Sequence, residues 1–136
     1  MKQLINSNDR FNLSPKGDNV AYVEREFPDR GDFELWVHNV ARGTRRLLTS
    51  GPEKMPSLLW SPDGDAVVFG SLGDGNTKIY CAQADGSRQV HSLVQGPNRL
   101  HPFSWHPTER KLLYGEFVPG VKKKAQLWVA TFSDTD

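Results

Sequence analysis

Cysteine is almost absent from this sequence, and its scarcity excludes several kinds of protein. Cys81 is the single cysteine among 136 residues, so no disulfide forms within the chain and a metal site of several thiolates is excluded. No stretch approaches the ~20 consecutive apolar residues that a membrane-spanning helix needs. The first ten residues, MKQLINSNDR, contain no apolar run of signal-peptide length. We expect a soluble, cytoplasmic chain without membrane contact, although an export signal removed beforehand would leave no trace.

An excess of charge of either sign is also missing. Seventeen basic side chains stand against sixteen acidic ones, which gives a formal net charge of +1. No strong field therefore favours nucleic acid, and the short basic run at 122–124 is typical of a solvated loop. Hydrophobic residues make up 37% of the chain, enough to build the core of one domain spanning residues 1–136.

A repeated pattern runs along the chain. The stretches LSPKGDNVAYVER, WSPDGDAVVFGSL and WHPTERKLLYGEF contain Pro15, Pro62 and Pro107, which lie 47 and 45 residues apart. Each is followed by a second recurring stretch: ELWVHNV, KIYCAQA and QLWVATF. A period of this length is typical of propeller blades and of helical-pair repeats. Nine prolines, twelve glycines and short runs rich in Val, Tyr, Phe and Trp favour strands over helices.

Each repeat is predicted to contain four strands. In the middle unit these cover residues 57–61, 66–70, 78–82 and about 89–94. Ser61, Pro62, Asp63 and Gly64 occupy the successive positions of a type I turn, in which proline presets φ and glycine suits the last position. Because Ser61 lacks the Gly-x-Ser-x-Gly context of an activated serine, we interpret this motif as a hairpin bend rather than a nucleophile.

The stretch PSLLWSPDGDAVVFGS, followed by KIYCAQADGS, resembles the repeat of TolB-like, WD40-like β-propellers. The resemblance implies an all-β fold of three four-stranded antiparallel blades at about 10–50, 56–96 and 101–136. The first unit departs from the pattern at Leu13 and Lys16, and the third at His106, Thr108 and Glu109. Members of this family range from periplasmic scaffolds to propellers attached to peptidases and kinases, so the resemblance implies a fold more than a function.

Three blades are fewer than the four to eight with which propellers close. The third unit ends without a fourth strand, whereas KQLINSN at the start aligns with the fourth strands RRLLTSG and HSLVQGP. We therefore predict a six-bladed ring closed by homodimerisation with N-terminal strand exchange. In this ring, residues 2–6 of each chain, including Gln3, Leu4 and Ile5, complete the third blade of the other.

Motifs of catalysis are also missing. The sequence has no Gly-rich phosphate loop, no His-Glu-x-x-His helix and no paired zinc ligands. The stretch GSLGDGNTK lacks the Gly-Lys-Ser/Thr ending of a phosphate loop, and Asp74 and Asn76 lack the carboxylate spacing of a calcium site. We expect no metal, no cofactor, no catalytic residues and hence no enzymatic activity.

Loops of mixed charge are predicted to gather on one rim, where a rigid scaffold would present them for recognition. The candidate binding residues are Arg25, Glu26, Arg30, Glu53, Lys54, Arg99, His101 and Glu116. The favoured function is a non-catalytic binding or scaffolding module that recognises a protein, a peptide or a small polar ligand. Two alternatives are a hydrolase- or lactonase-type propeller with a channel metal or acid/base site, and the propeller portion of a larger receptor or kinase.

Overall fold

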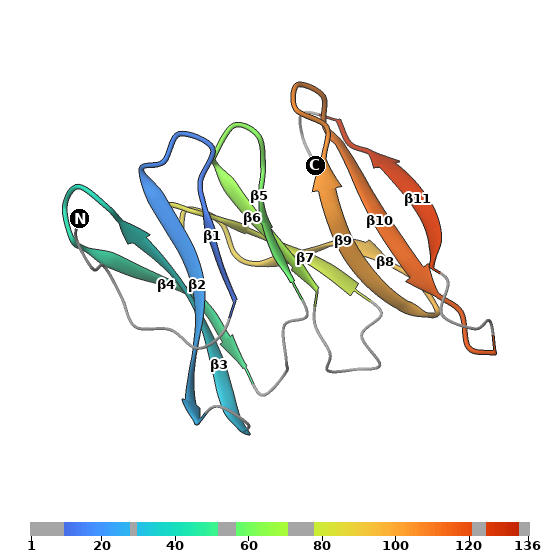
Figure 1. Cartoon of the computed structure of the whole chain (residues 1–136), viewed down its shortest axis with the longest axis horizontal. Coiled ribbons are helices and arrows are strands. Elements are labelled where there is room, and N and C mark those ends of the chain that lie inside the picture. The colour runs from blue at the N-terminus through green and yellow to red at the C-terminus, as the bar shows by residue number, and fades with distance from the viewer. Residues whose placement is uncertain (1–9, 28–29, 52–56, 71–77, 121–124, 134–136) are drawn as a thin grey trace.

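The computed structural model describes residues 10–27, 30–51, 57–70, 78–120 and 125–133 (Figure 1), without the side chains of residues 26, 27, 30 and 31. These residues form three antiparallel sheets, placed one after another along the chain. They contain no helix, and so none of a length and hydrophobicity that would cross a membrane. The all-β fold predicted from the sequence is confirmed.

The first two sheets have four strands each, paired in the order of the sequence. The first sheet consists of β1 (Phe11–Leu13), β2 (Asn19–Phe27), β3 (Arg30–Asn39) and β4 (Arg45–Gly51). The second consists of β5 (Leu58–Trp60), β6 (Ala66–Gly70), β7 (Lys78–Gln83) and β8 (His91–Gln95). The bounds of the second sheet agree with the predicted strands to within about two residues, because proline, glycine and alternating apolar residues mark the ends of each strand.

The third sheet has three strands in the described part of the chain. They are β9 (Arg99–Trp105), β10 (Lys111–Phe117) and β11 (Gln126–Thr131), in the order β11-β10-β9. The other two sheets each carry a fourth strand beyond the third, so one edge of β11 has no partner strand among the described residues. The segment predicted to fill this place in another copy, which includes Gln3, Leu4 and Ile5, lies outside the described residues, and strand exchange stays a prediction.

The Ser-Pro-Asp-Gly motif forms the bend between β5 and β6. The Gly64 N–H donates to the Ser61 carbonyl at 2.9 Å, and Gly64 has a φ of 78°, in the left-handed region that suits glycine. The Ser61 hydroxyl donates to Asp63 Oδ1 at 2.6 Å and accepts the Ala66 N–H at 3.0 Å. The motif is therefore a hairpin bend, as predicted, and the serine hydroxyl holds the bend together.

The corresponding turns of the other two sheets are also held by hydrogen bonds between side chains and backbone N–H groups, made by different residues. Before β2, Ser14 Oγ donates to Asp18 Oδ1 at 2.7 Å and accepts the Asn19 N–H at 3.0 Å. Between β9 and β10, His106 Nδ1 accepts the N–H groups of Thr108 and Glu109 at 3.2 and 3.0 Å. An imidazole nitrogen thus replaces the serine hydroxyl in the third repeat, which lacks the usual Ser-Pro-x-Gly sequence.

The hydrophobic core lies between the sheets. Residues of one face of the first sheet pack against the second, and residues of the other face of the second sheet pack against the third. The first cluster includes Ala21, Val23, Leu35, Val37, Trp60, Val67 and Phe69, and the second includes Val68, Ile79, Cys81, Leu100 and Leu112. All five residues of β6 are consequently buried, as expected for a blade with a neighbour on each side.

Polar contacts between the innermost strands fix the spacing of the sheets. The Trp60 indole N–H donates to the Asn12 carbonyl at 2.9 Å, which ties β5 to β1. The Ser57 hydroxyl donates to the Pro102 carbonyl at 3.3 Å, which ties the start of the second sheet to β9. These bonds use main-chain carbonyls that point between sheets, so the three sheets hold a defined arrangement around their inner strands.

Candidate functional site

A cleft of about 400 Å³ lies between the second and third sheets, at the end where the β5–β6 and β9–β10 turns lie. The turns around Asp63 and Glu109 form opposite walls. Its lining combines both signs of charge with apolar surface: Asp63, Glu109, Arg88, Arg110, Cys81, Leu93 and Trp105 all contribute. We consider this cleft the candidate functional site because it brings charged donors and acceptors next to an apolar wall.

Asp63 is an anion in this cleft at neutral pH. Burial raises its pKa, but hydrogen bonds from the Ser61 hydroxyl and the Asp65 N–H, together with the charge of Arg110, outweigh burial and leave the pKa below its usual value. The hydrogen bond that the Ser61 hydroxyl donates to Asp63 also commits this hydroxyl to the turn. Ser61 and Asp63 therefore shape the wall of the cleft, and both hydrogen bonds of the Ser61 hydroxyl are made within the turn.

Cys81 lies at the base of the cleft and is 7% exposed. Burial raises the pKa of its thiol, and the nearby charges of Arg88 and Arg110 oppose this only in part. The thiol is therefore protonated at neutral pH and a weak nucleophile. Cys81 is accordingly a packed side chain of the core between the second and third sheets.

The cleft places cationic side chains beside apolar surface. Within the described ranges, no three His, Cys, Asp or Glu side chains come together to hold a metal ion. Arg88 and Arg110 present guanidinium donors that match carboxylate oxygens, while Leu93 and Trp105 offer apolar surface. The arrangement fits a ligand that carries an apolar side chain beside a carboxylate or amide.

Of the eight residues predicted for the binding rim, the structure brings Arg99 and His101 together. Both lie on β9, and Arg99 sits 5.1 Å from the ring centre of Phe117 while the His101 ring lies 4.8 Å from that of Phe103. Burial lowers the pKa of His101, with smaller contributions from the positive charges of Arg99 and Arg10. His101 is accordingly biased towards its neutral form.

Among the other predicted rim residues, Glu116 and Arg25 are separated from this pair. Glu116 pairs in register with Leu100, so its side chain lies on the opposite face of the third sheet, where it accepts a hydrogen bond from Asn98 Nδ2 at 3.1 Å. Arg25 lies in the first sheet. Glu26 and Arg30 lie at the ends of β2 and β3 with side chains outside the described set, and Glu53 and Lys54 lie outside the described residues.

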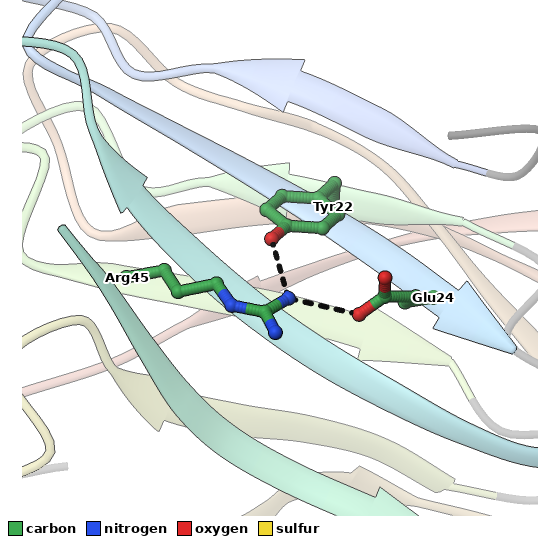
Figure 2. A network of polar contacts seen from close by, with 3 residues as sticks. All are labelled: Tyr22, Glu24 and Arg45. Atoms are coloured by element: carbon green, nitrogen blue, oxygen red, sulfur yellow. Dashed lines mark hydrogen bonds and ion pairs between the residues drawn. The ribbon is translucent and has the colours of Figure 1, made fainter. Parts of the chain in front are cut away.

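A second polar group, on the first sheet, was not foreseen from the sequence (Figure 2). Arg45 Nη1 donates to the Tyr22 hydroxyl at 3.2 Å and to Glu24 Oε2 at 2.9 Å. The guanidinium carbon also lies 3.8 Å from the ring centre of Trp36. Arg45 belongs to β4 and the other three residues to β2 and β3, so this network links three adjacent strands.

Sequence reasoning also missed the cleft, since it placed the binding residues on the opposite rim. The signal that was present is modest: Arg88 follows the Asp85-Gly86 bend and Arg110 follows the third turn, and both bends fall at the same ends of their sheets. Whether two such turns border a cavity depends on how closely the sheets pack, which the repeat pattern does not encode.

Comparison with known proteins shows which proteins this chain resembles. No family model matches the chain. The uncharacterised peptidase YuxL of Bacillus subtilis is 24% identical over 125 residues, which cover 83% of this chain and 19% of that protein. A TolB protein from Agrobacterium tumefaciens superposes with a TM-score of 0.72 at 20% identity, covering 93% of this chain and 46% of that one.

Two enzymes share the same arrangement. An oligogalacturonate lyase in complex with manganese superposes with a TM-score of 0.63 at 20% identity over 93% of this chain and 35% of its own. An acylaminoacyl peptidase in complex with a chloromethyl ketone superposes with a TM-score of 0.67 at 12% identity over 89% of this chain and 23% of its own. The chain has the TolB-like propeller fold, as predicted, and spans less than half the length of each of these proteins.

The expectation that the chain has no enzymatic activity is contradicted by these comparisons. Its structural neighbours include a lyase and a peptidase, and its relative in sequence is named a peptidase, so the comparisons point to enzyme-related propellers. The error has a physical origin. Short local motifs report catalytic groups only when these lie close in sequence, whereas an active site can be assembled from segments that are distant in sequence.

Proposed function

We propose that this chain is part of the propeller of a peptide-cleaving enzyme and that it contributes to binding the peptide. The main support for this proposal is the alignment with the peptidase YuxL, which extends across 83% of the chain. The likeness to an acylaminoacyl peptidase supports the same class. Ser61, which is committed to a turn, and Cys81, which is protonated, would then not be the reacting groups.

The cleft between the second and third sheets is the part of the chain best suited to this role. Arg88 and Arg110 would receive a carboxylate of the peptide, and Leu93 and Trp105 would contact an apolar side chain next to it. Peptides that end in an apolar residue with a free carboxylate combine these two groups. Asp63 and Glu109 would disfavour a second negative charge nearby.

Fluorescence anisotropy tests this proposal directly. The probe is a fluorescein-labelled tetrapeptide ending in leucine with a free carboxylate, and its amidated form is the comparison. We expect the free acid to bind more tightly, and Arg110→Gln and Arg88→Gln each to weaken binding by about tenfold, the range expected for one charge-assisted hydrogen bond. Arg42→Gln, which changes an exposed arginine of the β3–β4 turn, is the matched control and should leave binding unchanged.

The outcomes separate two enzyme classes. No binding of either peptide, or equal loss with all three arginine variants, would contradict peptide recognition at this cleft. Binding of oligogalacturonate in place of the peptide would favour the class of the lyase neighbour instead.

A further inference from the structure

An apolar groove of about 410 Å³ lies at the ends of the inner strands β5 and β9, beside the turns that follow these strands. Figure 1 shows that the turns of all three sheets lie at this same end of the molecule. The turn proline of each sheet contributes to the groove, and three aromatic side chains form much of its wall: Pro15, Pro62, Pro107, Trp60, Phe103 and Trp105. We call this cavity the inner groove.

The inner groove differs from the cleft in its chemistry. The cleft is lined by both signs of charge, whereas none of the described residues around the inner groove is charged. Trp60 is 6% exposed and its indole N–H is bonded to the Asn12 carbonyl, so this ring forms a fixed wall. Phe103 is 40% exposed and offers open apolar surface to a ligand. Prolines and aromatic rings together suit the flat ring of an aromatic side chain.

The inner groove and the cleft share one wall. Pro62, Trp105 and Pro107 line both cavities, so the two adjoin each other across these three side chains. A ligand that lies over this wall can therefore reach both cavities at once. In an extended peptide, side chains two residues apart point to the same side, about 7 Å from each other along the chain. Two such side chains can accordingly fill the two cavities together.

We propose that the inner groove binds an aromatic side chain of the peptide, two positions before its C-terminal residue. This inference rests on the proposed function, which puts the C-terminal apolar residue and its carboxylate in the cleft. Among peptides with such a C-terminus, the inner groove then selects those with an aromatic residue at the third position from the end. Charge contributes to recognition in the cleft, and burial of apolar surface contributes in the inner groove.

Fluorescence anisotropy with three fluorescein-labelled tetrapeptides measures this preference on the full chain. All three end in leucine with a free carboxylate: Gly-Phe-Gly-Leu, Gly-Ala-Gly-Leu and Gly-Gly-Phe-Leu. We expect the first to bind about tenfold more tightly than the second, which corresponds to partial burial of one aromatic ring. The third peptide has the same composition as the first, with phenylalanine one residue out of register, and should bind like the alanine peptide.

Two substitutions that alter the inner groove outside the shared wall identify the site. Phe103 lines the inner groove but not the cleft, so Phe103→Ala should remove the preference for phenylalanine and leave the affinity of the alanine peptide unchanged. Ser104 is an exposed residue of the groove. Ser104→Asp should reverse the preference, so that Gly-Lys-Gly-Leu binds more tightly than Gly-Phe-Gly-Leu, because the new carboxylate attracts the lysine ammonium.

Phe11→Ala is the matched control for these variants. Phe11 is a 68% exposed phenylalanine of the inner strand β1 and lines neither cavity, so this variant should keep the full preference for phenylalanine. Far-ultraviolet circular dichroism and an unchanged affinity for the alanine peptide show that each variant is folded.

Failure of this inference is distinguishable from failure of the proposed function. If the three peptides bind equally while Arg88→Gln and Arg110→Gln weaken each of them, the cleft binds the carboxylate and only the role of the inner groove is overturned. A preference for phenylalanine that survives Phe103→Ala also overturns the inference alone. If Gly-Phe-Gly-Leu depends on Phe103 but binds equally as free acid and amide, the proposed role of the cleft is overturned. Binding of none of the peptides overturns both.

Discussion

The ring of Phe103 lies directly over the backbone of Gly115. A methyl group added at Gly115 would come within 2.6 Å of Phe103 Cε2 and 3.0 Å of the Ala125 Cβ. The absence of a side chain at this position therefore allows an aromatic residue of β9 to lie against β10. The contact also holds the Phe103 ring against the His101 ring, whose centre is 4.8 Å away.

Gly115→Ala is expected to destabilise the fold by about 1–2 kcal/mol, because the added methyl group displaces the Phe103 ring. Urea unfolding at a fixed protein concentration measures this loss. Gly96→Ala is the control and should cost less than about 0.5 kcal/mol, since its nearest neighbour would lie at an ordinary 3.9 Å. If Phe103 is the obstacle, Gly115→Ala should cost less in a Phe103→Ala background; an unchanged cost would assign the effect to Ala125.

The example of Gly115 illustrates how far the sequence alone was informative. The repeated Pro-x-Gly turns and the apolar-aromatic pairs predicted the strands of the second sheet almost residue by residue, because they reflect local backbone preferences. The three strands that the structure describes in the third sheet also agree with the repeat pattern. Local preferences do not report the packing of Phe103 on Gly115, which depends on strand register and on a shift in pairing between Leu113 and Tyr114.

The candidate site was harder to predict for the same reason. Charged loop residues were grouped on one rim by their position in the repeat, yet Glu116 and His101 point to opposite faces of the third sheet. The cleft near Arg88 and Arg110 arises where two turns from different sheets approach each other. How closely these two turns approach depends on the volumes of the side chains packed between the sheets. The distance between the turns therefore could not be predicted from the sequence alone.

Ser61→Ala should destabilise the protein by about 1–2 kcal/mol. The substitution removes the hydroxyl that accepts the Ala66 N–H and donates to Asp63, and Ser61 is 8% exposed, so water cannot readily replace it. Thermal or urea unfolding measures the change, and the exposed Ser50 of β4 provides the control Ser50→Ala, expected to be nearly neutral. Equal effects of the two substitutions would show that the turn does not depend on the serine hydroxyl.

Stability is expected to fall on mild acidification because of His101. Burial first, and then the charges of Arg99 and Arg10, lower its pKa from the usual 6.5. The unfolded chain therefore takes up a proton at this residue at a higher pH than the folded chain does. Stability contributed by neutral His101 is complete above about pH 6.5 and is lost as the pH falls from there towards the lowered folded pKa.

The comparison of wild type with His101→Gln isolates this effect. Urea midpoints at pH 7.5 and pH 5.5 should differ more for the wild type than for the variant, in which the other three histidines are unchanged. NMR titration of the imidazole signals supplies an independent check, with the His101 midpoint expected below 6.5. A His101→Gln variant that loses as much stability on acidification as the wild type would exclude this residue as the cause.

Arg45 is expected to stabilise the first sheet through its flat contact with Trp36 more than through its charge. The Arg45–Glu24 pair is roughly half exposed, with side-chain exposures of 45% and 41%, and exposed ion pairs contribute little. A guanidinium 3.8 Å from the centre of an indole ring is worth about 0.5–1 kcal/mol at an exposed position. A lysine keeps the charge but cannot stack in the same way.

Arg45→Lys and Arg45→Met should therefore destabilise the fold by similar amounts, about 0.5–1 kcal/mol, in urea unfolding at a fixed protein concentration. Glu24→Gln serves as the test of the ion pair and should have a smaller effect, with little dependence on salt. The alternative has a distinct signature. If Arg45→Lys retains full stability while Glu24→Gln is costly and salt-sensitive, the carboxylate rather than the indole ring is the partner that matters.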